Sequence, residues 1–150
     1  MIIALDLNVV LDVVQNRQPH YQDSAEVLSR IRIGEIAALL PSHGVTTLWY
    51  LLDKAANPAT ANQTVDWLLN HFEIGATDKA AFQTAPRFPI PDFEDAVVTS
   101  LARSANSDYI VTRNVADFAG SPVPAITPTE SLKLLPAPTP PAAPETPGET

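Results

Sequence analysis

The stretch IIALDLNVVLD, residues 2–12, decides the fold, because a short apolar run ends there on an acid. Residues 2–5 are too few for a core helix and are typical of a buried strand. Asp6 follows directly, and Asn8 and Asp12 come later in the same stretch. If that stretch is helical, six steps of about 100° turn Asp12 well away from Asp6. We therefore predict that Asp12 is a solvated helix residue and that Asp6 is the candidate functional acid.

The rest of the chain alternates between strand and helix patterns. Strands are expected at 36–40 and 108–112, with a short one at 72–76. Helices are expected over 20–35, 43–57, 59–72, 78–85 and 92–106, and the segment 123–127 leads into a closing helix at 128–135. This alternation predicts an α/β fold, with a parallel sheet covered by helices on both faces. Sites in such sheets form at the carboxyl ends of the strands.

Composition restricts the class of protein. The 150 residues fit one domain, which we place at 1–135, followed by a tail at 136–150. The tail has six prolines and no hydrophobic period, so it is expected to be disordered. The chain has no cysteine, which excludes disulfides and thiolate metal sites. We see no signal peptide and no membrane-spanning apolar stretch, and expect a soluble cytoplasmic protein.

The net charge of −8 argues against indiscriminate coating of DNA, because phosphate contacts need positive charge. It does not argue against a nuclease, since a cluster of acids that gathers divalent cations is negative until the cation binds. Charge alone therefore leaves the function open.

A second group of acids lies in the segment PDFEDAV, residues 91–97. Asp92 and Asp95 are three residues apart, which places both on one face of the first helical turn, with Glu94 turned away. Taken alone, this segment favours a structural role, because Pro91 before Asp92 with an acid three residues later resembles a capping box. For Asp6 and Asn8 taken alone, a capping role is about as plausible as a functional one, since both residue types are good helix N-caps.

A third group follows the strand in DYIVTRNVADF, residues 108–118, where Thr112, Arg113, Asn114 and Asp117 lie close in sequence. Taken alone, Asn and Asp here fit ordinary turn chemistry. Together, the three groups could meet at one edge of a parallel sheet. Clustered carboxylates repel one another unless a cation joins them, and a site with only oxygen ligands selects Mg²⁺ or Mn²⁺. The histidines His20, His43 and His71 share no spacing and are expected to be surface or partly packed residues.

The ordered set ALDLNVVLD, DFEDAV and DYIVTRNVADF resembles the signature of PIN-domain ribonucleases, including VapC-type toxins. The resemblance covers about residues 1–135 and implies a three-layer α/β/α fold with a central, mostly parallel sheet of about four or five strands. Asp6 would match the first metal-binding acid and Asn8 its structural neighbour. Asp95 would match the acid of the helix, with Asp92 as an accessory acid. Asp117 or Asn114 would complete the site, flanked by Thr112.

The resemblance also implies a function, namely a Mg²⁺- or Mn²⁺-dependent endoribonuclease that is the toxin of a toxin–antitoxin pair. Asp6, Asp92, Asp95 and Asp117 would bind the metal and carry catalysis, and Arg113 and Arg103 could contact RNA. A small antitoxin would bind near the acids through a basic residue. Homodimers are implied as well, and the helices with Trp49, Tyr50 and Trp67 could form the interface, although aromatic residues at helical spacing are more often core residues.

Two departures from the family pattern keep an alternative open. Many members have a Glu on the helix after the second strand, where this chain has Thr47, and an Asp where it has Asn114. The alternative is a degenerate PIN module that binds RNA or a protein without cutting. An aspartate-nucleophile phosphatase fits poorly, because Asn8 stands where its second Asp is needed and no lysine lies between Lys79 and Lys133. A response-regulator receiver fails on the same missing lysine.

Overall fold

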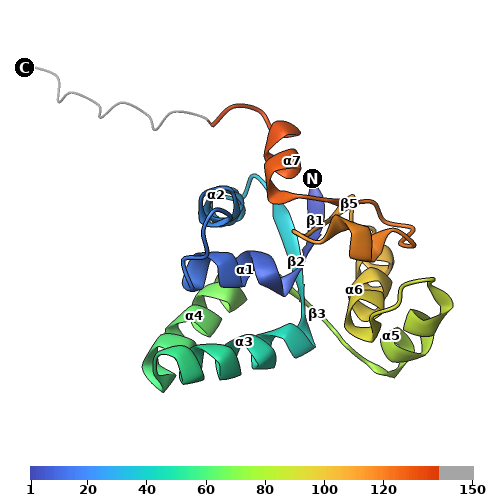
Figure 1. The fold of residues 1–150 in the computed structure, drawn as a ribbon, viewed down its shortest axis with the longest axis horizontal. Coiled ribbons are helices and arrows are strands. Elements are labelled where there is room, and N and C mark those ends of the chain that lie inside the picture. The colour runs from blue at the N-terminus through green and yellow to red at the C-terminus, as the bar shows by residue number, and fades with distance from the viewer. Residues whose placement is uncertain (139–150) are drawn as a thin grey trace, which may run out of the picture.

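The structure is a computed structural model that describes residues 1–138, so most of the predicted tail at 136–150 lies outside the described residues. The described part holds one parallel sheet with strand order β3-β2-β1-β4-β5 (Figure 1). The strands are β1 (Ile2–Leu5), β2 (Ala37–Pro41), β3 (Glu73–Gly75), β4 (Tyr109–Val111) and β5 (Ala125–Ile126). The strands predicted from the sequence are confirmed, and the segment at 123–127 contributes β5 at one edge.

Helices fill the connections between the strands. They are α1 (Leu7–Val14), α2 (Tyr21–Arg32), α3 (Ser42–Ala55), α4 (Pro58–His71), α5 (Lys79–Thr84), α6 (Phe93–Ser104) and α7 (Pro128–Lys133), with short 3₁₀ turns η1 (Ala85–Arg87) and η2 (Val115–Phe118). Local chemistry sets several of the ends. Gly34 adopts a positive φ of 81° just after α2, and Asn57 caps α4 ahead of Pro58.

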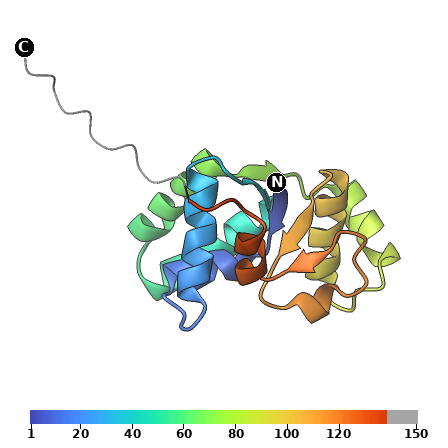
Figure 2. The ribbon, with the colours of Figure 1, turned by 90° about the horizontal axis from the view of Figure 1, so that it is seen from above.

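Two helical layers enclose the sheet (Figures 1 and 2). Side chains on one strand alternate between the two faces, so Ile3 and Leu5 join the core under α1 to α4, whereas Ala4 joins the core under α5 and α6. The three-layer α/β/α prediction is therefore confirmed. Among the described residues, no helix combines the length and the apolar character that crossing a bilayer requires.

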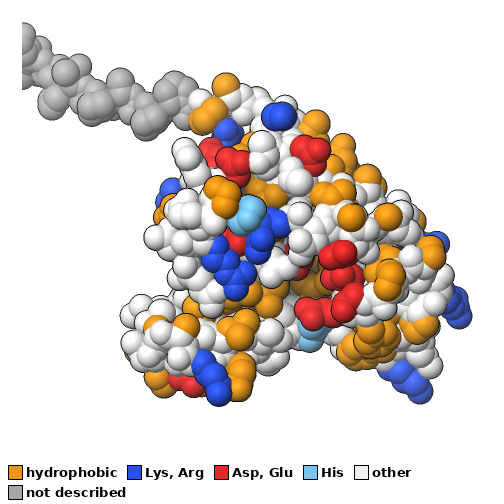
Figure 3. All heavy atoms as spheres, in the orientation of Figure 1, with side chains coloured by type: hydrophobic (Ala, Val, Ile, Leu, Met, Phe, Trp, Pro, Cys, Tyr) orange, Lys and Arg blue, Asp and Glu red, His pale blue; other side chains and the backbone are white. Residues whose placement is uncertain are grey.

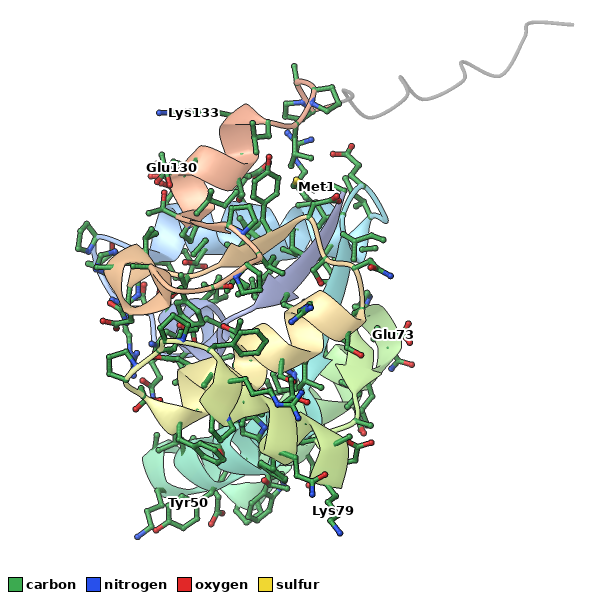
Figure 4. The ribbon with its side chains drawn as sticks, turned by 90° about the vertical axis from the view of Figure 1, so that its right-hand side faces the viewer. Met1, Tyr50, Glu73, Lys79, Glu130 and Lys133 are labelled. Carbon is green, nitrogen blue, oxygen red and sulfur yellow. The ribbon has the colours of Figure 1, made fainter. Side chains whose placement is uncertain are left out.

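The direction of the strands places their carboxyl ends at one side of the molecule. Met1, just before β1, lies at the same end as Glu130 and Lys133 of α7, while Tyr50 of α3 and Lys79 of α5 lie at the opposite end (Figure 4). All strands are parallel, so the chain leaves each of β1, β2 and β4 on the side away from Met1. The starts of α1, α3 and η2 therefore lie along one edge of the sheet.

Candidate active site

Asp6 leaves β1 at this edge and is held in place by β4. Its main-chain N–H donates to the Val111 carbonyl at 3.0 Å, and the Thr112 hydroxyl donates to Asp6 Oδ2 at 2.7 Å. Thr112 is fully buried and accepts a bond from the Asn114 main-chain N–H at 3.0 Å. The carboxylate of Asp6 is thus oriented by a residue that the chain reaches more than a hundred positions later.

Two of the acids also cap helices, which was the structural alternative for both. Asp6 Oδ1 faces the Asn8 main-chain N–H at 3.5 Å as the N-cap of α1, and Asp92 Oδ1 accepts from the Asp95 N–H at 3.0 Å as the N-cap of α6. The contact between Asn8 and Asp6 comes from the main chain of Asn8. A cap occupies one of several lone pairs on a carboxylate, so it leaves room for a further ligand.

Asp95 shows that the acids converge. Partial burial and then the negative charges of Asp92, Asp6, Asp117 and Glu94 raise the pKa of the Asp95 carboxyl to about 7. Acids from α1, α6 and η2 therefore lie within electrostatic reach of one another. Figure 3 shows acidic side chains gathered around a hollow, with a histidine directly beside them.

The residues present fit a hard divalent cation by donor type and charge. Within residues 1–138, no three Asp, Glu or His side chains are close enough together, as they stand, to hold a metal ion. Partial burial and then repulsion from the neighbouring acids nevertheless keep the Asp95 carboxyl protonated up to about pH 7. A cation would relieve this repulsion, and carboxylate oxygens are the ligands that Mg²⁺ and Mn²⁺ prefer.

Thr47 brings no charge to this group of acids. It is exposed on α3, and its hydroxyl donates to the main-chain carbonyl of His43 at 3.2 Å. The hydroxyl of Thr46 donates to the same carbonyl at 2.9 Å. Both hydroxyls are therefore engaged with their own helix, as is common for Thr in a helix.

The prediction that Asp12 is solvated is wrong. Asp12 is fully buried, its Oδ2 accepts a bond from the Ser24 hydroxyl at 3.0 Å, and Arg113 Nε lies 2.8 Å from the same oxygen. The Nε–H does not point at that oxygen, so the contact is an ion pair without a well-formed hydrogen bond. The face of α1 opposite Asp6 is covered by α2 and by the loop after β4.

The two arginines predicted to contact RNA lie in different places. Arg113 is beside the acids in sequence, but its Nε faces the buried Asp12. Arg103 is exposed in the last turn of α6, with its guanidinium 5.9 Å from the ring centroid of Phe88. Eight residues separate it from Asp95, which is about 12 Å along a helix. A direct role for either residue in binding RNA stays a prediction.

The raised pKa of Asp95 makes this side chain destabilising at neutral and higher pH. The folded protein keeps the proton up to about pH 7, whereas the unfolded chain releases it near 3.8, so stability falls as pH rises between these values. We expect Asp95→Asn, in EDTA, to raise the free energy of unfolding at pH 8 by on the order of 1–2 kcal/mol, allowing for solvent screening.

Urea unfolding at pH 8 and pH 5 measures this effect, and the gain should shrink at the lower pH. Asp66→Asn, at an exposed position on α4, is the control and should change stability little at either pH. A gain for Asp95→Asn that is absent at pH 8, or equal at both values, would contradict the crowding of acids.

A family model described as PIN domain matches residues 3–116. The chain therefore belongs to the PIN domain family. No curated protein matches the sequence significantly.

Solved structures with the same fold come from toxin–antitoxin complexes and toxins. One is VapBC2 of Rickettsia felis bound to a promoter DNA fragment, at 18% identity over 85% of this chain and 98% of that chain, with a TM-score of 0.62. Another is VapBC-1 of nontypeable Haemophilus influenzae, at 17% identity over 86% of this chain and 99% of that chain, with a TM-score of 0.64. A third is VapC20 of Mycobacterium tuberculosis, described as a sarcin-ricin loop cleaving toxin. It is 11% identical over 72% of this chain and 86% of that chain, with a TM-score of 0.59. At these identities the similarity establishes the fold.

Proposed function

We propose that the protein is a metal-dependent endoribonuclease, the toxin of a type II toxin–antitoxin pair. The observation that carries the proposal is a group of acids in a PIN domain, at the carboxyl ends of parallel strands, where partial burial and then the neighbouring negative charges raise the pKa of Asp95 to about 7. Crowding of this kind costs stability, and strongly perturbed pKa values cluster at functional sites.

Each residue has a distinct part in the proposed site. Asp6 and Asp95 hold Mg²⁺ or Mn²⁺, supported by Asp92 and Asp117, and Thr112 fixes the carboxylate of Asp6 through its 2.7 Å hydrogen bond. When bound, the cation activates a water and neutralises charge on the phosphate. Asp92 fixes the start of α6 by capping it, which keeps Asp95 turned toward the other acids.

Metal removal tests the proposal directly. The purified protein is expected to cleave structured RNA in the presence of Mg²⁺ or Mn²⁺, leaving 3′-hydroxyl and 5′-phosphate ends, and to lose this activity in EDTA. Gel analysis of end-labelled RNA, with end-group chemistry on the products, measures both. Activity that persists in EDTA would exclude a metal-dependent reaction.

The alternative is a PIN module that binds RNA or a protein and does not cut. Thr47 and Asn114 favour it, because neither supplies the carboxylate found at that position in many family members. Calorimetric titration separates the two functions. No metal binding at millimolar Mg²⁺ or Mn²⁺, together with no cleavage, supports the alternative.

The proposed toxin has protein partners as well as RNA. A small antitoxin is expected as a partner, since VapBC structures share the fold. We expect it to cover the acids with a basic side chain, because the acids are crowded and negative. We also propose a homodimer that uses α3 and α4, where Tyr50 is exposed while Trp49 and Trp67 pack partly against the core.

Cellular RNA as substrate and the lack of cysteine fit a cytoplasmic protein.

A further inference from the structure

His43, in the first turn of α3, is held by hydrogen bonds that leave one ring nitrogen free. Its Nδ1 lies 3.1 Å from Thr77 Oγ1. The Ser42 hydroxyl accepts from the Thr77 main-chain N–H at 3.0 Å and donates to Thr77 Oγ1 at 2.9 Å. Thr77 Oγ1 keeps a second lone pair that can accept from His43 Nδ1–H, so an imidazolium is held through Nδ1 and its Nε2–H is free to act as a donor.

Nε2 of His43 faces the acids. It lies 3.6 Å from Oε1 of Glu94, a residue in the first turn of α6 between Asp92 and Asp95. This separation is longer than an ordinary hydrogen bond, so Nε2 is not committed to Glu94. The His43 side chain is 29% exposed and that of Glu94 is 59% exposed, so a molecule bound at the acids can reach Nε2.

His43 also lies on the face of α3 that carries position 47. Residues four apart in a helix share a face, so His43 is one turn before Thr47 and closer to the carboxyl end of β2. The Thr47 hydroxyl is bonded to the carbonyl of His43, and it offers no proton-transferring group. The face on which many PIN domains carry a Glu therefore presents an imidazole toward the acids in this chain.

We propose that His43 is a catalytic residue that donates a proton from Nε2 to the leaving 3′-oxygen of the RNA; this inference rests on the proposed nuclease function. Water attacks phosphorus, a new P–O bond forms, and the P–O3′ bond breaks with its electron pair on O3′. That oxygen takes the Nε2 proton of the His43 imidazolium, which becomes a neutral imidazole with its hydrogen on Nδ1. The proton of the attacking water passes to solvent, and solvent reprotonates Nε2 of His43. One water is consumed per cleavage.

A leaving group that needs no proton tests this role. We compare His43→Gln and His43→Ala with the wild type on one cleavable RNA oligonucleotide and on the same oligonucleotide with sulfur replacing the bridging 3′-oxygen. Mn²⁺ is used throughout, because sulfur is a poor ligand for Mg²⁺. His43→Gln is expected to lower kcat on the normal RNA by about 10²-fold or more. On the sulfur-bridged RNA it should cleave at close to the wild-type rate.

Thr47→Ala is the matched control, on the same face of α3, and should keep wild-type rates on both substrates. Thermal unfolding checks that both His43 variants are folded. Variants as fast as the wild type on normal RNA, or slowed equally on both substrates, would overturn the proton-donor role. A wild type that cleaves neither substrate shows instead that the nuclease function fails, and the inference fails with it.

Discussion

Asp6→Asn is expected to lower the rate of metal-dependent RNA cleavage by about 10³-fold or more while the protein stays folded. The substitution removes the negative charge that binds the cation. It keeps an oxygen for the contact with the Asn8 N–H, and Asn is as good an N-cap as Asp. Its NH₂ group then faces the Thr112 hydroxyl, which can turn to accept a hydrogen bond where it donated one to the carboxylate. The loss of activity can then be assigned to the site and not to the fold.

Asp78→Asn provides a control of the same chemistry. Asp78 caps α5 by accepting from the Ala81 N–H at 3.0 Å, and it is not among the charges that raise the pKa of Asp95. This variant should cleave RNA like the wild type. Initial rates in Mn²⁺, with thermal unfolding of each variant, measure the comparison. Equal activity of Asp6→Asn and wild type in carefully purified samples would exclude Asp6 as a metal ligand.

Arg113→Ala is expected to lower the free energy of unfolding by about 3 kcal/mol, because it leaves the buried carboxylate of Asp12 without a cation. Within residues 1–138, Asp12 then keeps the hydrogen bond from the Ser24 hydroxyl. Asp12→Asn should cost less. It removes the buried charge, and Arg113, which is 22% exposed, can turn toward water.

Urea unfolding of Arg113→Ala, Asp12→Asn and the double variant measures the coupling between the two residues. Arg87→Ala, at an exposed position in η1, is the control and should change stability little. The cost of Arg113→Ala should fall sharply once Asp12 is neutral. Purely additive costs would mean that the 2.8 Å contact contributes nothing to stability.

Much of the fold follows from local patterns, and what those patterns missed depends on distant partners. The apolar runs of β1, β2 and β4 and the spacing of α6 are visible in the sequence because each element carries its own period. The edge strand β5 has two residues and is defined by its pairing with β4. A strand this short has no period that a sequence pattern could reveal.

The residues of the site also fall into two groups, those that the sequence reveals and those whose role depends on distant partners. Acids at strand ends and helix starts are visible in the sequence, so Asp6, Asp92, Asp95 and Asp117 could be selected before the structure was known. Helical geometry correctly turns Asp12 away from Asp6, but it gives no information about Arg113, which covers Asp12 from the far end of the chain. His43 shares no spacing with other candidate residues, and the sequence does not reveal its neighbours Thr77 and Glu94, because they come from other elements.

The two capping acids bear on how the site would decay under relaxed selection. A descendant that had lost its nuclease function would still gain stability from Asp6 and Asp92, because each begins a helix. Asp95 caps no helix and opposes folding at neutral pH, so drift would remove it early. Among relatives of this chain, a carboxylate at position 95 is therefore a better marker of an active enzyme than one at position 6 or 92.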